Sequence, residues 1–450
     1  MRETHRKILR TLNDASFAAY FVGGSVRDHI LGRTSKDVDV TTSATPEQVA
    51  RLFPGSELVG AHFGVVLVKT EDDETVEVAT FRTDGVYTDA RRPSTVTYTN
   101  DVRVDVARRD FTMNALLMDV HGKVYDHVGG RDDLRDSLIR TVGDPVQRFQ
   151  EDALRMLRAI RFASQLGFLI EHDTFEAIKT CTVRIRRISA ERIRDELNRI
   201  MTSGGADFGL DLLSMSGLLE IVMPEIEALK ECPQNPKYHP EGDVFIHTRR
   251  LLAQLPKGCS LTLALSALLH DVGKPAALGF KLDAHGVSVP TAYDHENIGV
   301  PIAVGILSRL KYPNDVQELV TSHVKQHMMF PSVEGMRRAK QMRFIGQPHF
   351  SELLELHRLD SMAGCGDLEA YTFVKTLSED TPKEVVHPAK LITGRDLIER
   401  GLQPGPLFRE ILEAVDEAQL EGTVTTKEEA MAKVLEFVFA KASKHQEVAA

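Results

Sequence analysis

The stretch Gly23-Gly24-Ser25-Val26-Arg27-Asp28, followed by Asp37-Val38-Asp39, decides how the amino-terminal part of the chain is expected to fold. It predicts a strand, a Gly-Gly turn, a helix, a loop and a second strand. Alternate side chains of a strand share a face, so Asp37 and Asp39 would lie about 7 Å apart on one side. Paired carboxylates supply the oxygen ligands that suit magnesium, and a Gly-Gly turn lets backbone amides approach phosphate. The combination predicts a site for a metal-bound triphosphate.

A β-hairpin is predicted next, where GVVLVKT (64–70) and TVEVATFR (75–82) flank an acidic turn. Glu77 is a charged residue within a strand rich in valine. It could face solvent at a sheet edge, or it could lie beside Asp37 and Asp39 as a third carboxylate on a neighbouring strand. Three clustered carboxylates would hold two metal ions, which activate a hydroxyl and stabilise a leaving pyrophosphate.

Composition places the chain among ordinary soluble proteins of more than one domain. It has 450 residues, of which 42% are hydrophobic and 27% are charged. No apolar run is long enough to cross a bilayer, and the charged start MRETHRKILRTLND lacks the apolar core of a secretory signal. The four cysteines are far apart and predict free thiols. We therefore expect a cytoplasmic protein without membrane contact.

Charge is distributed unevenly along the chain. The net charge of −10 is unfavourable for a nucleic-acid-binding protein, but arginines are concentrated between residues 155 and 199. Phosphate responds to charge within about 10 Å, so a local basic surface can act despite the overall balance. The alternative is a solvated helix face.

The periodicity of the sequence changes near residue 145. Strand and helix signals alternate before it, with a helix-like segment at 105–119, and helical periodicity dominates after it. Prolines at 233, 236 and 240 mark a break, and 376–388 has the composition of a linker. We predict an α/β head at 1–143, a helical neck and body at 144–230, a further helical domain at 231–375 and a helical tail at 376–450.

The segment EDALRMLRAIR (151–161) has the pattern of a helix on which Asp152 and Arg155 share one face. An acceptor beside donors matches the pairing edges of adenine and cytosine, which offer an amino group beside a ring nitrogen. Such a template would accept ATP and CTP and reject GTP and UTP. The alternative is a simple ion pair between Glu151 and Arg155, worth a few tenths of a kcal/mol.

Arg108 and Arg109 lie next to a predicted helical run, and guanidinium groups bind phosphate through their planar fork of donors. The sequence does not distinguish which of the two would make the contact. A surface salt-bridge cluster is the other interpretation.

Together, GGSVRD…DVD, VEVATFR, RRDFTMNAL and EDALRMLRAIRF resemble the motifs of class II tRNA nucleotidyltransferases and bacterial poly(A) polymerases. The resemblance implies an α+β protein, in which a DNA polymerase beta-like α/β head precedes a mostly α-helical neck, body and tail. It implies catalytic Mg²⁺ and roles for particular residues: metal binding by Asp37 and Asp39, a third carboxylate at Glu77, triphosphate contacts by Gly23, Gly24, Arg27 and Arg109, base reading by Asp152 and Arg155, and support of nucleotide and phosphate by Arg158 and Arg161.

Two segments favour CCA addition within this group. VGAHFGVVLV (59–68) resembles the CCA-adding version of this strand, and DGVYTDARRP (84–93) resembles a flexible loop that enzymes adding only CC lack. We expect metal-dependent addition of CMP and/or AMP from CTP and ATP to the 3′ end of tRNA. Addition of A alone and poly(A) polymerase activity stay open, as does the oligomeric state.

Farther along, His247, His270-Asp271, the Asp294-His295 segment and Asp360 resemble the HD phosphohydrolase pattern. This resemblance implies an HD domain at 231–375 in which His247, His270, Asp271 and Asp360 hold a second divalent cation (Mg²⁺, Mn²⁺ or Ni²⁺). His323 is a weaker candidate ligand. The alternative function is therefore a phosphatase or 2′,3′-cyclic phosphodiesterase with an RNA-holding head. The tail resembles the tRNA-contacting end of related enzymes.

Overall fold

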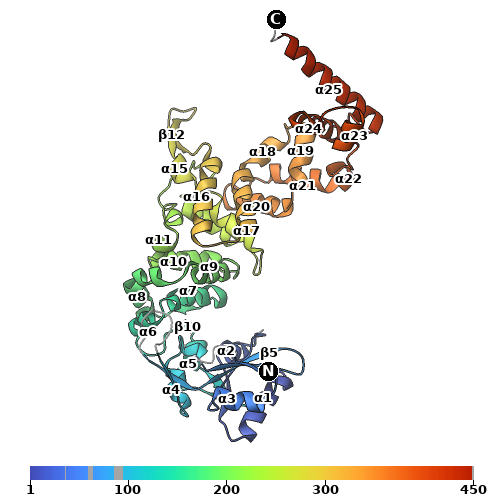
Figure 1. Cartoon of the computed structure of the whole chain (residues 1–450). Helices are drawn as coiled ribbons and strands as arrows, with labels where there is room; N and C mark the ends of the chain where they lie inside the picture. The colour runs from blue at the N-terminus through green and yellow to red at the C-terminus, as the bar shows by residue number, and fades with distance from the viewer. Residues whose placement is uncertain (36, 59–63, 86–94, 448–450) are drawn as a thin grey trace. The chain divides into compact units, whose positions relative to one another are not determined.

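A computed structural model describes residues 1–35, 37–58, 64–85 and 95–447, with side chains as far as residue 439 (Figure 1). It contains two compact units. The first comprises 1–232, 248–264 and 304–317, and the second comprises 233–247, 265–303 and 318–450. Among the described residues, no helix combines the length and apolar character needed to span a bilayer.

A mixed seven-stranded sheet organises the head, in the order β3-β4-β5-β2-β1-β8-β9. The predicted β4–β5 hairpin is confirmed, and β2 pairs in parallel with β5. Because β5 has a partner on each side, it is not an edge strand. The strands of this sheet are β1 (Ala19–Val22), β2 (Asp39–Thr42), β3 (Glu57–Leu58), β4 (Val65–Lys69), β5 (Thr75–Thr80), β8 (Leu117–Met118) and β9 (Val124–Tyr125).

Short helices precede, connect and follow the strands of this sheet along the chain. The predicted turn and helix after β1 are confirmed: Gly23 has a φ of +78°, which favours glycine, and α2 begins at Gly24. A capping box between Thr45 and Gln48 starts α3. The helices are α1 (Glu3–Asp14), α2 (Gly24–Ile30), α3 (Pro46–Leu52), α4 (Val102–Ala107) and α5 (Gly130–Arg135), and β6 (Arg82–Asp84) pairs with β7 (Val96–Tyr98).

The expected helix at 105–119 is wrong beyond its first residues. Helix α4 ends at Ala107, a 3-10 turn spans Thr112–Asn114, and β8 follows. Leu117 pairs with Val22 of β1 and is fully buried, so the chain extends there to complete the sheet. Tertiary pairing therefore overrides local helix preference.

Beyond the head, helices dominate the chain, and the predicted change of architecture is confirmed (Figure 1). The rest of the first unit's amino-terminal segment contains β10 (Leu138–Ile139), α6 (Pro145–Glu151), α7 (Leu154–Leu166), β11 (Leu169–Ile170), α8 (His172–Cys181), a 3-10 helix (Thr182–Arg187), α9 (Ala190–Met201), α10 (Ala206–Met215), α11 (Leu218–Val222) and α12 (Pro224–Glu227).

The single helix expected at 151–161 is broken between α6 and α7. Asp152 has extended backbone angles, and its Oδ1 accepts a hydrogen bond of 3.0 Å from the amide of Leu154. A carboxylate that accepts from the first amide of the next helix stabilises a break, because the first amides of a helix lack partners within it. Asp152 and Arg155 therefore do not share one helical face.

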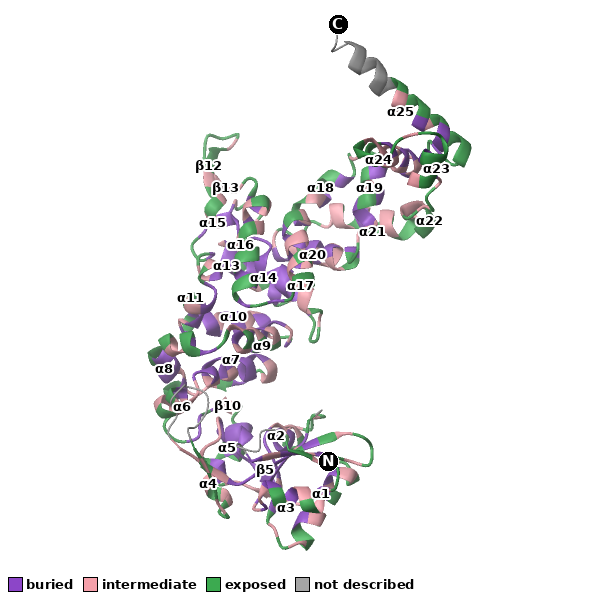
Figure 2. Ribbon diagram, viewed as in Figure 1, coloured by how far each residue is buried: buried purple, intermediate pink, exposed green. Residues whose placement is uncertain are grey.

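The following segment is helical apart from the hairpin of β12 (Gly279–Leu282) and β13 (Ser288–Thr291). Buried residues concentrate on the faces where these helices pack (Figure 2). The helices are α13 (Val244–Leu252), α14 (Leu261–Leu269), α15 (Lys274–Ala277), α16 (His295–Arg309), α17 (Asn314–Gln326), a 3-10 helix (His327–Met329), α18 (Phe330–Val333), α19 (Arg338–Ile345), α20 (Phe350–Ala363), α21 (Glu369–Asp380) and α22 (Lys383–Val386).

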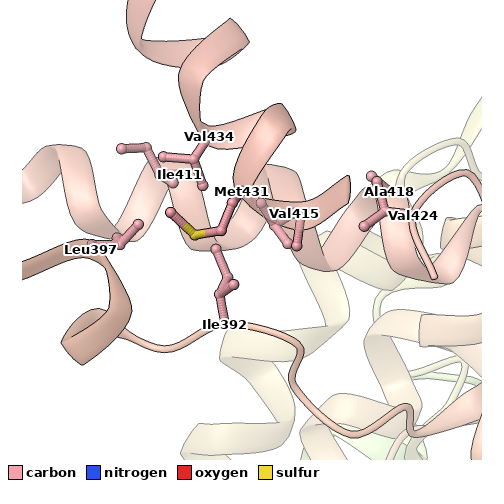
Figure 3. Close-up of a cluster of buried hydrophobic side chains, with 9 residues drawn as sticks. Ile392, Leu397, Ile411, Val415, Ala418, Val424, Met431 and Val434 are labelled. Carbon is pink, nitrogen blue, oxygen red and sulfur yellow. The ribbon is translucent and has the colours of Figure 1, made fainter. Parts of the chain in front are cut away.

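The tail has a hydrophobic cluster of its own (Figure 3). Helices α23 (Gly394–Glu399), α24 (Pro406–Leu420) and α25 (Lys427–Glu447) bring together buried side chains that include Leu397, Ile411 and Val434. Burial of such apolar side chains contributes about 1.5–3 kcal/mol each, which explains why this polar stretch of sequence folds into packed helices.

Candidate active site

A cleft of about 950 Å³ in the first unit gathers most of the predicted head residues. It is lined by the Gly23–Gly24 turn, by two of the predicted carboxylates and by arginines from α2, α7 and the segment after α4. Among its described lining residues, seven are basic and four are acidic, so the cleft is basic although the chain is acidic. The charged residues are Arg27, Arg33, Arg109, Arg158, Arg161, Arg199, Lys257, Asp28, Asp37, Asp39 and Asp110.

The three predicted carboxylates lie at one corner of the sheet. The parallel register of β2 and β5 places Glu77 opposite Asp39. Strand β2 begins at Asp39, so Asp37 precedes the strand and the alternation predicted for the pair does not apply, although both side chains line the cleft. Glu77 is exposed, and the ligand oxygens of the three residues do not all lie within 4.8 Å of one another.

The charges of Glu77 and Asp37 affect the pKa of Asp39. Burial raises the pKa of Asp39 to about 6, with further increases from Glu77 and Asp37 and an opposing effect of Arg109. Like charges concentrated around a partly buried carboxylate favour either a proton or a bound cation. An all-oxygen donor set of this kind fits magnesium.

Gly23 lies close to this corner. A Cβ atom at Gly23 would approach the Asp39 Oδ2 atom to 3.2 Å and the Arg109 guanidinium to 3.9 Å. The positive φ and the narrow space both favour glycine at this turn.

Two arginines, Arg27 and Arg109, are held in place around the cleft. The buried Arg27 donates to Asn114 Oδ1 at 2.9 Å and to Asp28 Oδ1 at 2.8 Å. Arg109 donates to Asp105 Oδ2 at 3.3 Å and lines the cleft. Arg108 donates to the same Asp105 and lines a different pocket, so the structure places Arg109 on the cleft side.

Arg158 and Arg161, on successive turns of α7, approach the ring of Phe162 in the cleft wall, with guanidinium carbons at 5.6 and 4.2 Å from the ring centre. Arg158 donates to Asp110 Oδ2 at 2.9 Å, and the buried Arg161 donates to Glu196 Oε1 at 3.1 Å. Burial lowers the pKa of Arg161 to about 10, which leaves it charged at neutral pH.

Asp152 and Arg155 form hydrogen bonds with residues that are not among those lining the cleft. Asp152 Oδ2 accepts from Arg192 at 3.0 Å, while Arg155 donates to Glu151 Oε2 at 2.7 Å and to the carbonyl oxygen of Arg108 at 3.2 Å. The Glu151–Arg155 ion pair is the alternative that the sequence allowed. Neither Asp152 nor Arg155 is among the described residues that line the cleft.

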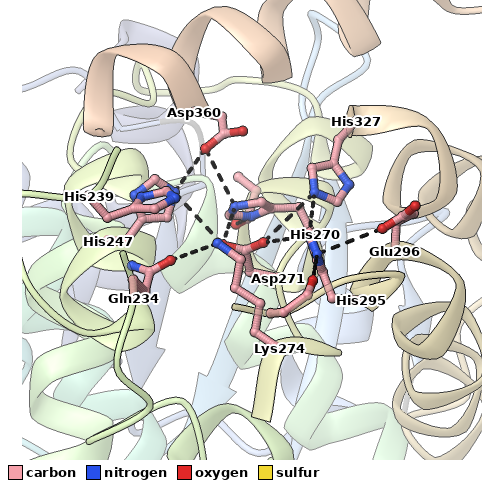
Figure 4. A network of polar contacts seen from close by, with 12 residues as sticks. Gln234, His239, His247, His270, Asp271, Lys274, His295, Glu296, His327 and Asp360 are labelled. Atoms are coloured by element: carbon pink, nitrogen blue, oxygen red, sulfur yellow. Dashed lines mark hydrogen bonds and ion pairs between the residues drawn. The ribbon is translucent and has the colours of Figure 1, made fainter. Parts of the chain in front are cut away.

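A second group of polar side chains lies in the second unit (Figure 4). The structure brings together His247, His270, Asp271 and Asp360, the four residues predicted from the HD pattern. The Nε2 atom of His247 lies 2.9 Å from Asp360 Oδ1, and that of His270 lies 3.1 Å from Asp271 Oδ2. Three of the four are almost completely buried.

Two further histidines join this group, which we call the histidine cluster. The Nε2 atom of His295 lies 3.2 Å from Asp271 Oδ1 and 3.1 Å from the Nε2 atom of His327. His295 belonged to the sequence pattern but was not among the predicted ligands, and His327 was missed. The weaker candidate, His323, lies outside the cluster, where its Nδ1 atom is 2.9 Å from the hydroxyl of Ser266.

The charges of the histidine cluster are strongly coupled. Burial alone would raise the pKa of Asp271, but His270 and Lys274 hold it well below its ordinary value. Burial opposes protonation of His247, yet hydrogen bonds to Asp360 and Glu241 raise its pKa to about 9. Burial lowers the pKa of His327 to about 3.

Comparison with known proteins identifies the family. The "CCA-adding enzyme" of Levilactobacillus brevis is 33% identical over 433 residues, which cover 95% of this chain and 96% of the relative. The chain belongs to the family of CCA-adding enzymes. The class II resemblance is thereby confirmed. The Staphylococcus aureus enzyme is 49% identical over 199 residues, or 44% of this chain and 50% of its own length.

Family models match three parts of the chain: the poly(A) polymerase head domain at 19–140, a probable RNA and SrmB binding site of polymerase A at 167–230, and tRNA nucleotidyltransferase domain 2 at 301–435. The crystal structure of the Bacillus stearothermophilus CCA-adding enzyme in complex with CTP has a TM-score of 0.73 and 28% identity. The match covers 99% of this chain and all of the other. Fold and family therefore agree along the chain.

Proposed function

We propose that the chain adds CMP and AMP from CTP and ATP to the 3′ end of tRNA, with the reaction in the head cleft. The observation that carries the proposal is that one basic cleft joins the Gly-Gly turn, Asp37, Asp39 and Arg109. Relatives named as CCA-adding enzymes, including one solved with CTP, support the choice of tRNA and of these nucleotides.

The carboxylate corner fits magnesium, because burial and neighbouring carboxylates raise the pKa of Asp39 and so favour a compensating cation. Asp37, Asp39 and Glu77 would hold the ions. Magnesium bound there would polarise the α-phosphate and stabilise the departing pyrophosphate.

The arginines of the cleft position the nucleotide. Arg27 and Arg109 would bind the triphosphate with Gly23 and Gly24, because guanidinium groups donate bidentately to phosphate and a glycine turn leaves room for it. Arg158 and Arg161 would add positive charge and orient the nucleotide from α7. The 3′-hydroxyl oxygen attacks the α-phosphorus, the bond to the bridging oxygen breaks, the hydroxyl proton is released and pyrophosphate leaves. Positioning and charge stabilisation supply most of the rate in such transfers.

Base selection is assigned to Asp152 and Arg155, which offer an acceptor and donors to the pairing edges of cytosine and adenine. Both side chains now bond to other residues. To bind a base, Asp152 must break its hydrogen bond with Arg192, and Arg155 must break its hydrogen bond with Glu151. The assignment therefore includes a rearrangement of these ion pairs when nucleotide binds.

Addition of A alone and poly(A) synthesis are the closest alternatives. The segments that favoured CCA addition, 59–68 and 84–93, lie partly outside the described residues. One assay separates the three activities: transcripts of one tRNA that lack CCA, end in CC or end in CCA are incubated with CTP, ATP or both. CCA addition predicts that CTP and ATP complete the first transcript, ATP extends the second by one residue, and the third is unchanged. Extension by long runs of A would contradict it.

A second candidate activity is phosphohydrolysis at a divalent metal held by His247, His270, Asp271 and Asp360. The observation that favours it is that residues 113 positions apart, His247 and Asp360, meet at 2.9 Å around the buried Asp271. Imidazole and carboxylate together are typical ligands of divalent transition metals. Metal-dependent phosphate release that survives Asp37→Ala and is lost in Asp271→Ala would support it, and release that Asp37→Ala abolishes would contradict it.

A further inference from the structure

The aromatic ring of Phe162 lies among three of the arginines that line the head cleft. The guanidinium carbon of Arg161 is 4.2 Å from the ring centre, that of Arg27 is 5.2 Å away and that of Arg158 is 5.6 Å away. Phe162 and all three arginines line the cleft. A cation within about 6 Å of a ring centre is attracted to it, because the ring face carries partial negative charge. Phe162 therefore attracts three cations that repel one another.

These arginines come from two helices that are far apart in the chain. Arg158, Arg161 and Phe162 belong to α7, whereas Arg27 belongs to α2. One helical turn separates Arg158 from Phe162, and Arg161 is its direct neighbour, so local structure explains both contacts. The contact with Arg27 is a tertiary one. The ring thus joins α7 to the helix that follows the Gly23–Gly24 turn.

The ring and the neighbouring carboxylates hold the arginines by different means. Each of the three guanidinium groups also donates to a carboxylate, and each such bond occupies an N–H group. An attraction to a ring face occupies none, so it can fix a guanidinium while N–H donors stay available to phosphate. Burial and the charge of Arg158 lower the pKa of Arg161, which indicates that positive charge is crowded here.

The ring of Phe162 is itself held in place. Phe162 is 6% exposed and packs edge-to-face against the fully buried Phe111, with ring centres 5.8 Å apart and ring planes at 84°. Aromatic pairs favour this arrangement. A fixed ring can determine where the guanidinium groups around it lie.

We propose that Phe162 is a positioning residue for the triphosphate, and that its ring face holds Arg27, Arg158 and Arg161 where the phosphate groups bind. This inference rests on the assignment of these arginines to the nucleotide in the head cleft, as proposed above. Because Phe162 acts through the arginines, its contribution should be the same for CTP and for ATP.

The alternative is that Phe162 only fills the hydrophobic core. Phe168, which follows α7, provides a comparison because it is exposed to the same extent, 6%. Among the described residues, Phe168 does not line the cleft, and no arginine or lysine lies over its ring. If the ring of Phe162 has a purely apolar role, its electron density should not affect nucleotide binding. If the ring attracts cations, its electron density should affect it.

Fluorination of the ring tests this difference directly. Phenylalanine analogues with one, two or three ring fluorine atoms are incorporated at position 162 of the full chain, where they keep nearly the same shape but weaken the negative charge of the ring face. The KM for CTP and for ATP is expected to rise with each fluorine, by about tenfold in total, while the KM for tRNA stays unchanged. Inorganic tripolyphosphate, which has no base, should become a weaker inhibitor in the same order.

The same analogues at position 168 are the matched control. They should leave the KM for both nucleotides unchanged, and circular dichroism with thermal unfolding checks that each protein is folded. A KM for CTP and ATP that stays constant across the series at position 162 would overturn the role of Phe162. So would an equal rise at positions 162 and 168, because it would show an effect of packing alone.

Arg27→Ala separates failure of this inference from failure of the proposed site. In the otherwise unmodified chain, this variant should raise the KM for CTP and ATP if the arginine binds the triphosphate. A rise in Arg27→Ala without any effect of fluorine would overturn only the inference about Phe162. An unchanged KM in Arg27→Ala would overturn the triphosphate assignment and, with it, the role of Phe162.

Discussion

The head cleft and the histidine cluster both gather carboxylates, but they balance charge in opposite ways. In the head, Glu77 lies opposite Asp39 in the sheet register, and burial together with the charges of Glu77 and Asp37 raises the pKa of Asp39 to about 6. In the histidine cluster, His270 and Lys274 hold the pKa of Asp271 low against burial. The first arrangement suits cations that arrive with a triphosphate. The second, closed and rich in nitrogen ligands, suits ions that stay with the protein.

The largest expected effect comes from disabling one of the two sites at a time and measuring both activities. Asp39→Ala should reduce nucleotide incorporation by at least about 10³-fold, because a ligand of the catalytic cations is lost, while metal-dependent phosphate release continues. Asp271→Ala should do the reverse. Incorporation by gel assay and phosphate release are measured on the same preparations. Loss of both activities in both variants would show that the sites do not work independently.

Arg109 and Arg108 form a matched pair for the head cleft. Both bond to Asp105, but only Arg109 lines the cleft beside Asp39. Arg109→Ala should lower kcat/KM for CTP and ATP by about 10²-fold, as expected for removal of one charged donor to the reacting phosphates. Arg108→Ala should stay within about tenfold of wild type. Equal losses in the two variants would contradict the assignment of Arg109 to the triphosphate.

Glu241 tests how the histidine cluster is held. Its Oε1 atom lies 2.6 Å from the Nδ1 atom of His247, whose Nε2 atom faces Asp360. Glu241→Gln should weaken metal binding by about 10–100-fold without changing the number of ions at saturation, because the carboxylate orients the imidazole and increases its basicity. Titration with Mn²⁺ measures this. An unchanged affinity would mean that Glu241 does not support a metal ligand.

The smallest expected effect is a gradual dependence of nucleotide incorporation on pH. Asp39 must be ionised to bind Mg²⁺, so below pH 6 the Mg²⁺ concentration for half-maximal incorporation should rise by about tenfold per pH unit. Glu77→Gln removes a like charge and should lower the pKa of Asp39, which moves the transition to lower pH. Incorporation rates from pH 5 to 8 at several Mg²⁺ concentrations measure it. A transition that Glu77→Gln leaves in place would argue against coupling of the two carboxylates.

Contiguous motifs were the part of the molecule most open to prediction. The turn and helix at Gly23–Gly24 and the β4–β5 hairpin are local structures, specified by glycine conformation and by alternating apolar residues. Placing Glu77 beside Asp39 needed the parallel register of β2 and β5, two strands that α3, β3 and β4 separate along the chain. The break at Asp152 was missed because it depends on one hydrogen bond from the amide of Leu154 to the Asp152 side chain, within an otherwise regular helical pattern.

The histidine cluster shows where such prediction stops. His270-Asp271 is visible as a dipeptide, but His327 carries no local signal, because a single histidine in a helical segment is usually a packing or surface residue. The sequence analysis named His323, four residues earlier, as a weaker candidate instead. His323 turns toward Ser266, whereas His327 turns toward His295.

The amino-acid sequence by itself determined the family, the α/β head, the helical remainder and the Gly-Gly turn, because these depend on short-range periodicity and on residue types close together in the chain. Only the tertiary structure decided that Arg109 rather than Arg108 faces the cleft, that Arg155 pairs with Glu151, and that His327 meets Asp271. Those outcomes depend on strand register and helix packing between distant segments, which no local pattern encodes.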